Sequence, residues 1–243
     1  MNKVAIITGG SKGIGNALVL KFKTDGFKVI SISRNKVNNL EDSEQVICDL
    51  SNIDDAENCL NKLLNNLKEI KPQEIILINN AGTLGEINRV ENIDSKNIES
   101  TVSLNFTAPL ILSSQFIKNT KSWSCLRKII NISSGAAVGS YYGWSVYCAS
   151  KAAMDSFTKV VAVEQESEEN PVKIMAIYPG VVDTNMQKLI RTKSKEEFKN
   201  VSRFIELKEN NELSNPLEVA NEIYQISNDK SIVNGAVLDV RNF

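Results

Sequence analysis

Two side chains that can exchange protons lie four residues apart in the stretch GWSVYCASKAAMD, which covers residues 143–155. A free tyrosine such as Tyr147 has a pKa near 10, and a nearby ammonium group such as that of Lys151 favours the phenolate. Lowering the pKa by about two or three units, at about 1.4 kcal/mol each, would bring the phenol into the range useful for acid–base catalysis. On a helix that begins near Ser145 the two side chains share one face. The pair could therefore protonate a carbonyl oxygen while hydride arrives at the carbon.

The other ionisable residues limit which side chains can act as acids, bases or metal ligands. The chain contains no histidine, so acid–base work must use Tyr, Lys, Asp, Glu or Cys. Its four cysteines are scattered without C-x-x-C spacing, at Cys48, Cys59, Cys125 and Cys148. This pattern argues against a metal site and against a disulfide framework, and it predicts free thiols in a reducing cytosol.

Length and composition are those of an ordinary globular protein. The 243 residues carry a net charge of −1, and 42% of them are hydrophobic. No basic patch stands out, the apolar runs are far shorter than a membrane span, and the N-terminus lacks the pattern of a secretion signal. The length fits one large domain as well as two small ones. Because no linker divides the chain, we expect one cytoplasmic domain over residues 1–243 that binds neither nucleic acid nor membrane.

Seven short apolar runs alternate with helical patterns along the chain. Because these runs are continuous and not alternating, they predict parallel strands buried on both faces. Helices are expected over about 14–25, 53–69, 97–118 and 147–164, which gives a Rossmann-type doubly wound sheet with helices on both faces. The predicted strands are KVAIITGG, FKVISISR, EQVICDL, EIILINNAG, RKIINISS, VKIMAIYPG and AVLDV.

One long segment, residues 183–215, interrupts this alternation between the sixth strand and the next helix. Its periodicity predicts one or two amphipathic helices, and its length is typical of a lid over a substrate site. A surface insertion without a role is the alternative interpretation. The apolar faces are predicted from Met186, Leu189, Ile190, Phe198, Val201, Ile205 and Leu207.

The stretch TGGSKGIG, residues 8–15, lies between the first strand and the first helix. Glycines at this position let the backbone approach a pyrophosphate, and the helix N-terminus supplies free N–H groups. The spacing G-x-x-x-G-x-G differs from the usual dinucleotide fingerprint. A purely structural turn is the alternative, but the placement of the stretch favours nucleotide binding.

The second strand ends in SISRN, with Arg34 where NAD-binding enzymes carry an acidic residue. An arginine can bind the 2′-phosphate of NADPH, and Lys12 in the glycine-rich loop can add a second positive charge. The alternative is that both are solvated surface charges. Asp49, after the third strand, is expected either to contact the adenine or to stand at a helix N-terminus.

Other polar residues follow strands whose carboxyl ends line the ligand crevice in such sheets. Ser134 ends the fifth strand and can hydrogen-bond a substrate oxygen, whereas Ser133 is expected to point to the opposite side. The stretches NNAG (79–82) and YPGVVDT (178–184) end the fourth and sixth strands. Asn105 lies inside a predicted helix, where asparagine is a poor former, so we expect a specific hydrogen bond, a helix distortion or a harmless buried amide.

Five motifs in order, TGGSKGIG, NNAG, SLNF, SSG…YCASK and YPGVVDT, make the chain resemble the short-chain dehydrogenase/reductase family from Lys3 to Asp239. The resemblance implies a catalytic group of Asn105, Ser134, Tyr147 and Lys151. In the family the tyrosine is the general acid, the lysine binds the nicotinamide ribose, the serine orients the carbonyl and the asparagine holds a water. The implied NADP(H) contacts are Gly9, Ser11, Lys12, Gly13, Ile14, Arg34, Asp49, Asn80, Ala81, Gly82, Tyr147, Lys151, Pro179, Gly180, Val182 and Thr184.

Within that family the stretches GW-x-x-YC-x-x-KAA-x-D, DTNMQ and NGAVLDV are similar to sepiapterin reductases and to bacterial enzymes that reduce benzil. This similarity implies a vicinal dicarbonyl or α-hydroxy ketone as substrate. It places Trp144, Met186 and Asp239 near that substrate, although Trp144 could equally be a packing residue and Asp239 could serve only the fold.

The sequence therefore predicts an NADPH-dependent carbonyl reductase with a small-molecule substrate and no metal. A non-catalytic NADP(H)-sensing regulator and an alcohol dehydrogenase working in the oxidative direction are the alternatives. The resemblance also implies a homodimer or homotetramer, often formed in the family through two long helices that correspond here to about 97–118 and 147–164.

Overall fold

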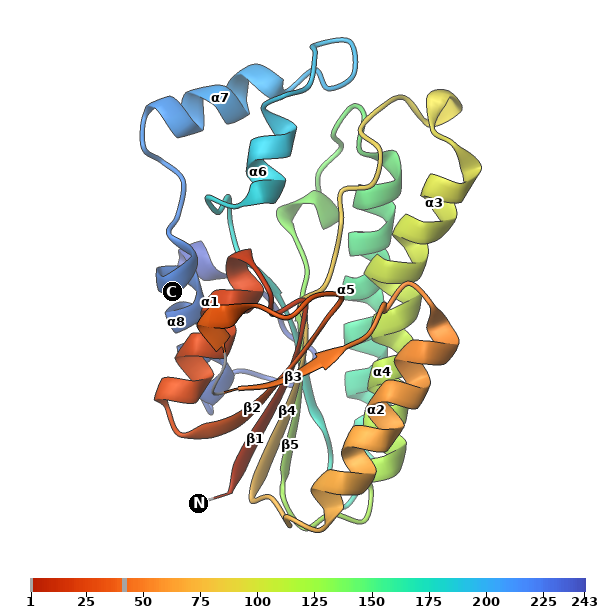
Figure 1. Ribbon diagram of the computed structural model, residues 1–243, viewed down its shortest axis with the longest axis vertical. Helices are drawn as coiled ribbons and strands as arrows, with labels where there is room; N and C mark the ends of the chain where they lie inside the picture. Colours follow the sequence, from red (N-terminus) through yellow and green to blue (C-terminus); the bar gives the residue numbers. More distant parts are fainter. Residues whose placement is uncertain (1, 41–42) are drawn as a thin grey trace.

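The computed structural model describes residues 2–40 and 43–243 as seven parallel strands with helices on both faces (Figure 1). The strand order is β3-β2-β1-β4-β5-β6-β7. The strands are β1 Lys3–Thr8, β2 Phe27–Ser33, β3 Glu44–Ile47, β4 Glu74–Asn79, β5 Leu126–Ile132, β6 Lys173–Tyr178 and β7 Val237–Asp239. The helices are α1 Gly13–Thr24, α2 Ile53–Lys68, α3 Ser95–Val102, α4 Ala108–Thr120, α5 Ser145–Gln165, α6 Asn185–Ile190, α7 Val201–Glu209 and α8 Pro216–Asn228. The predicted doubly wound sheet is confirmed.

Strand β1 explains why the apolar runs are continuous. Val4 and Ile6 point to one face of the sheet, and Ala5 and Ile7 point to the other. All four are at most 1% exposed, because helices cover both faces. A strand in this position has no solvent-facing side, so its sequence has no polar alternation.

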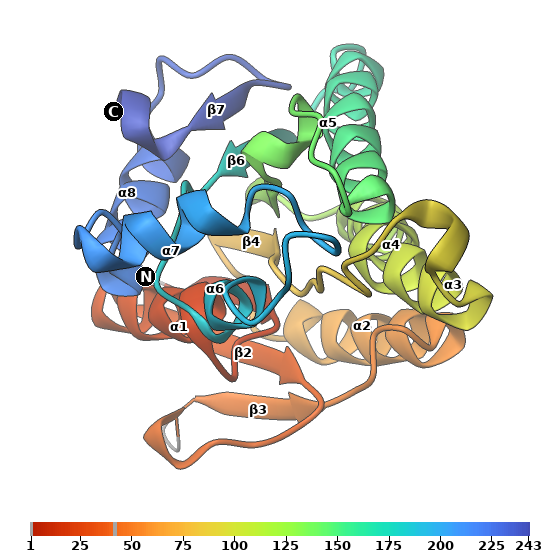
Figure 2. The same ribbon diagram turned by 90° about the horizontal axis from the view of Figure 1, so that it is seen from above.

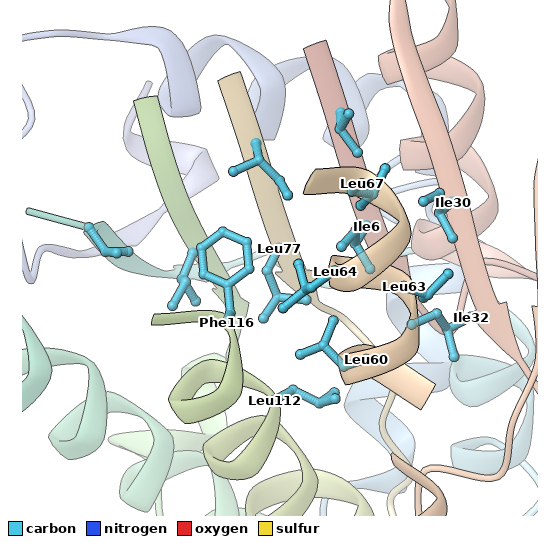
Figure 3. Close-up of a cluster of buried hydrophobic side chains, with 14 of the residues drawn as sticks. Ile6, Ile30, Ile32, Leu60, Leu63, Leu64, Leu67, Leu77, Leu112 and Phe116 are labelled. Carbon is cyan, nitrogen blue, oxygen red and sulfur yellow. The ribbon is translucent and has the colours of Figure 1, made fainter. Parts of the chain in front are cut away.

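Two hydrophobic cores result, one on each side of the sheet. The core under α2, α4 and α5 is drawn in Figure 3, where Leu60, Leu64 and Phe116 pack toward Ile6 and Leu77 of the strands. The other core lies under α1 and α8. Together the two cores fix the strands, so the residues at their carboxyl ends occupy defined positions.

The start of helix α2 follows from local sequence. Asn52 caps it, with its side chain accepting a hydrogen bond from the Asp55 amide at 3.4 Å. Asp54 and Asp55 lie in the first turn, where negative charge is favourable. The predicted bounds of 53–69 therefore hold to within one residue.

Helices α6 and α7 lie beyond the carboxyl ends of the strands, as the view from above shows (Figure 2). Both belong to the 183–215 segment that interrupts the β-α alternation. Their apolar face differs in part from the prediction, because Leu189 is 46% exposed while Phe204, which was not predicted, is buried. None of the helices in the described part of the chain is both long and apolar enough to cross a membrane.

Candidate active site

The side chains expected to do the chemistry meet between the end of β5 and the start of α5. Ser134 follows β5, and its hydroxyl lies close enough to the phenol of Tyr147 to act on the pKa of that group. Lys151 is one helical turn further along α5 on the same face. Its Nζ donates to Ile132 O at 2.8 Å and lies 5.9 Å from the centroid of the Tyr147 ring. The geometry thus places a hydroxyl, a phenol and an ammonium group in one site.

The expected lowering of the Tyr147 pKa does not occur in this arrangement. The side chain is only 7% exposed, and burial raises the pKa of the phenol while the hydrogen bond from Ser134 opposes that rise. Burial also lowers the pKa of Lys151 to about 8, against the opposing charge of Asp155. The prediction considered only the four-residue spacing and not burial, which acts on both groups. At neutral pH the phenol therefore holds its proton.

Asn105 lies at the centre of a π-helical turn, Ser103–Thr107, between α3 and α4. Its Nδ2 donates to Thr83 O at 2.8 Å and to Ser150 Oγ at 3.2 Å, and its Oδ1 accepts from the Thr83 amide at 2.8 Å. The predicted helix over 97–118 is thus interrupted at the asparagine. Both a specific hydrogen bond and a helix distortion are present, and they join the loop after β4 to helix α5. Such π-turns often occur at functional sites.

A polar network that the sequence did not suggest lies below Lys151. Ser133 Oγ donates to Asp155 Oδ1 at 2.6 Å, and the Tyr178 hydroxyl donates to the other carboxylate oxygen. The Ser133 side chain therefore points toward Asp155 of α5 and not to the side of Ser134, as expected. Tyr147, Lys151 and Asp155 follow one another at intervals of four positions, and this spacing is the signal that could have revealed the network.

The glycine-rich loop fits a nucleotide pyrophosphate. Gly9 and Gly13 have φ angles of +69° and +57°, which side-chain-bearing residues rarely adopt. A Cβ added to Gly9 would lie 2.9 Å from Ala81 Cα, which is too close for a side chain, so the loop can pass this near the segment after β4 only with glycine. Helix α1 begins after Lys12 with no side-chain cap, which leaves its first N–H groups available to an anion. The residues present thus form the type of cradle that a dinucleotide requires.

The loop is held to the neighbouring strand end through Thr8. Its Oγ1 accepts hydrogen bonds from the amides of Asn80 and Ala81 at 2.9 and 3.0 Å. Asn80 Nδ2 in turn donates to Thr8 O at 2.9 Å. These bonds place the NNAG stretch beside the loop where β1 and β4 are neighbours, which is the point where the strand order reverses. Ligands of doubly wound sheets bind at this point.

The charges expected at the adenosine end are available to solvent. Arg34 and Lys12 are both exposed. Asp49 is exposed as well, and its Oδ1 accepts hydrogen bonds from the amide and the hydroxyl of Ser51 at 3.0 and 2.7 Å. These bonds, with a smaller effect of the Arg34 charge, hold the pKa of Asp49 below its usual value. Asp49 thus forms a turn before α2, whose cap is Asn52.

The cofactor residues expected after β6 approach the same loop. Gly180 has a φ angle of +74°, and Val182 pairs with Ser214 in an isolated parallel bridge. Thr184 caps α6, and its Cγ2 lies 3.2 Å from the position of a Cβ on Gly13. The remaining expected contacts lie on these same segments, with Ser11 and Ile14 in the glycine-rich loop and helix α1, Gly82 in the NNAG stretch and Pro179 after β6.

An aromatic cluster covers Tyr147. Trp144 stacks on Phe198 with ring centroids 4.5 Å apart and an interplanar angle of 15°, and it meets the Tyr147 ring edge-on at 5.6 Å. Phe204 of α7 adds a further edge contact at 5.5 Å, and Met186 of α6 packs against the cluster. The Trp144 Nε1 atom is buried without a hydrogen-bond partner. The cluster joins the start of α5 to the 183–215 segment.

Gly143 permits this close approach. Its φ angle is +87°, and an added Cβ would lie 2.2 Å from the carbonyl oxygen of Glu197.

Asp239, the other residue expected near the substrate, forms an ion pair with Arg241, whose Nε donates to Oδ1 at 2.9 Å. That ion pair holds the pKa of Asp239 below its usual value, and the carboxylate lies near Tyr178 at the end of β6.

The chain is similar to known proteins in both sequence and fold. The family model of short chain dehydrogenases matches residues 3–195. A benzil reductase ((S)-benzoin forming) from Bacillus cereus is 39% identical over 246 residues, covering 98% of this chain and 99% of that protein. A sepiapterin reductase from Rattus norvegicus is 33% identical, covering 79% of this chain and 78% of its own. The crystal structure of a short chain dehydrogenase/reductase from Saccharomyces cerevisiae is 27% identical with a TM-score of 0.84, covering 98% and 96% of the two chains.

Proposed function

This chain belongs to the short-chain dehydrogenase family, a family of NAD(P)-dependent oxidoreductases, and on that premise we propose that it is an NADPH-dependent carbonyl reductase. Its substrate is a vicinal dicarbonyl or an α-hydroxy ketone. The observation that carries the proposal is the placement of Ser134 beside a buried Tyr147, with Lys151 Nζ 5.9 Å from the centroid of the Tyr147 ring. That arrangement suits proton delivery to a carbonyl oxygen.

The residues of the site have separate tasks in this reaction. Ser134 orients the substrate oxygen, and the Tyr147 phenol, protonated at neutral pH, donates the proton. Lys151 keeps a positive charge beside the phenolate that remains after proton transfer, which stabilises it. Asn105 holds the loop after β4 against α5, which fixes the start of the helix. When bound, the nicotinamide supplies the hydride that the carbonyl carbon receives.

The preference for NADPH rests on Arg34 and Lys12. Both side chains are exposed, so the guanidinium and the ammonium group are hydrated and accessible to a ligand. A carboxylate at the end of β2 would repel a 2′-phosphate, whereas Arg34 can bind it through charge-assisted hydrogen bonds. Asp49 lies close enough to Arg34 for the charge of one to act on the other, and we propose that it contacts the adenine.

The substrate class follows from the cover over Tyr147. The benzil reductase from Bacillus cereus and the sepiapterin reductase from Rattus norvegicus are relatives whose names specify a dione and a pterin. Here the proton donor lies beneath aromatic side chains, which favours an apolar or aromatic carbonyl compound. We propose that residues 183–215 form a lid, because Phe198 of this segment stacks on Trp144, which in turn contacts the 7%-exposed Tyr147 edge-on.

The direct test is a panel of carbonyl compounds with the purified protein. We expect NADPH oxidation with benzil, with sepiapterin or with simple 1,2-diones, and a kcat/KM for NADPH above that for NADH. A preference for NADH would contradict the argument from Arg34. Tight NADPH binding without oxidation across the whole panel would support the non-catalytic sensor, and turnover only of alcohols with NADP⁺ would support the oxidative alternative.

The unpartnered Trp144 Nε1 gives a second prediction, which concerns the second oxygen of a dione. Trp144→Phe keeps an aromatic ring against Phe198 but removes the N–H donor. If that donor binds the second carbonyl oxygen, kcat/KM for benzil should fall about 10-fold, equivalent to ~1.4 kcal/mol. For deoxybenzoin, a monoketone with the same two phenyl groups, it should change by only about 2-fold.

The matched substrates separate recognition from packing. Equal losses for benzil and deoxybenzoin would mean that Trp144 only packs against the lid, which was the alternative left open by the sequence. Tyr142→Phe, a substitution in the same loop outside the aromatic cluster, serves as the control and should leave both substrates unaffected.

A further inference from the structure

Helix α5 carries a third ionisable group on the face that presents Tyr147 and Lys151. Asp155 follows Lys151 by four residues, so it occupies the next turn of the same face. Its side chain is 7% exposed, and a carboxylate this deep in the protein is costly unless its charge is compensated. The reaction proposed above does not use it, so its presence requires an explanation.

Hydroxyl groups hold both oxygens of this carboxylate. Ser133 Oγ donates to Oδ1 at 2.6 Å, and the Tyr178 hydroxyl donates to Oδ2. Ser133 Oγ also lies 3.4 Å from the carbonyl oxygen of Lys151, so this serine joins the two turns of the helix to the end of β5. Hydrogen bonds of this kind favour the ionised form of a carboxyl group. Both carboxylate oxygens of Asp155 therefore have hydrogen-bond donors in this buried position.

Lys151 is a buried cation one helical turn before this carboxylate on α5. Its side chain is 5% exposed, and its Nζ donates to a neutral acceptor, Ile132 O, at 2.8 Å. A cation buried beside neutral groups tends to lose its proton. We propose that Asp155 is the counter-ion of Lys151, a carboxylate fixed by Ser133 and Tyr178 that keeps the ammonium group charged within the site.

Asp155 is thus a positioning residue, because it acts on the reaction through Lys151. The role of Lys151 in catalysis rests on the proposed function. The effect of the Asp155 charge on the pKa of Lys151 does not depend on that function. In the described part of the chain, Asp155 is the carboxylate whose charge opposes the desolvation of Lys151.

The other ionisable groups around the pair differ in kind. Tyr147 and Cys148 on α5 hold their protons at neutral pH, because burial raises the pKa of each. Tyr178 on β6 has its pKa raised by burial and by its bond to Asp155, so it remains a donor. Asp239, at the end of β7, is paired with Arg241 and acts on Tyr178. Among these groups, Asp155 is the carboxylate whose charge acts on Lys151.

Two variants distinguish charge from structure. Asp155→Asn removes the negative charge, whereas Tyr178→Phe breaks the same network but leaves the charge in place. The Lys151 pKa is measured in the cofactor-free protein by NMR titration of isotopically labelled lysine, with the signal assigned from its loss in Lys151→Met. The alkaline limb of kcat/KM for carbonyl reduction is measured in parallel, since it reports the ionisation of the free enzyme.

We expect Asp155→Asn to lower the Lys151 pKa by about one unit or more, and to move the alkaline limb toward lower pH by the same amount. Tyr178→Phe should leave both within about 0.3 unit of the wild type, and Asp155→Glu should restore most of the shift. If Asp155→Asn does not fold because Tyr178 has lost its acceptor, Asp155→Asn/Tyr178→Phe removes both partners and carries the same expected shift.

An unchanged Lys151 pKa in folded Asp155→Asn, or equal shifts in Asp155→Asn and Tyr178→Phe, would overturn the inference. The NMR result also separates it from the proposed function. A lowered Lys151 pKa in a protein that reduces no carbonyl compound would sustain the counter-ion and refute the reductase.

Discussion

Tyr147→Phe should lower kcat for dione reduction by about 10²- to 10⁴-fold, the range that general acid catalysis contributes. The phenyl ring retains the edge contact with Trp144, whose centroid lies 5.6 Å from that of Tyr147, so the aromatic cluster should stay assembled. Only the proton donor and its hydrogen bond to Ser134 are lost. Initial rates with benzil as substrate, with NADPH binding measured by fluorescence titration, test this prediction.

Binding and chemistry should separate in that experiment. NADPH affinity should remain within a few-fold of the wild type, because the glycine-rich loop and Arg34 are untouched. Tyr142→Phe, which removes a phenol from the loop just before α5, should keep its activity. Turnover by Tyr147→Phe within a few-fold of the wild type would show that another group supplies the proton.

Lys151→Met should abolish most activity and, in contrast, stabilise the fold at neutral pH. The pKa of Lys151 is lowered from 10.5 to about 8, so the folded state binds fewer protons than the unfolded chain between these values. Stability therefore rises with pH across that window, and below pH 8 the full cost of burying the charge is present. Replacing the ammonium group with an apolar side chain should raise the free energy of unfolding at pH 7 by about 1 to 3 kcal/mol.

Denaturant unfolding at pH 7 and at higher pH measures the gain, which should shrink as the pH rises toward 10.5. Lys159→Met, an exposed position two turns further along α5, is the matched control and should show neither the stabilisation nor the loss of activity. A destabilised Lys151→Met at pH 7 would mean that the bond to Ile132 O, together with the compensation of the Asp155 charge, outweighs the desolvation of the ammonium group.

Much of the fold could be predicted because each element is encoded locally. The apolar run of β1 follows from burial on both faces, and Asn52 with the two aspartates after it fixes the start of α2. The spacing of Tyr147 and Lys151 was also informative, since a helix necessarily places residues four apart on one face. The glycine-rich loop was recognisable because its backbone needs positive φ angles.

What could not be predicted depends on packing between distant segments. The pKa of Tyr147 is raised by burial, and Tyr147 belongs to a cluster that includes Phe198 and Phe204, which no local pattern around residue 147 reveals. Leu189 was assigned to the apolar face of a helix that turned out to leave it 46% exposed, while Phe204 faces the cluster instead. Asp155 acquires its partners from β5 and β6, which are brought to α5 only by the fold.

The most direct test of the central claim follows the hydride itself. Benzil is incubated with the wild-type protein and with NADPH deuterated at the transferable C4 position of its nicotinamide, and the product is analysed by NMR. We predict benzoin with one deuterium on its carbinol carbon, formed in proportion to the NADPH consumed. Benzoin without deuterium from either C4 position would contradict the assignment of this protein as a carbonyl reductase. Absence of a deuterated hydroxy product from benzil, from sepiapterin and from every simple 1,2-dione would contradict it as well.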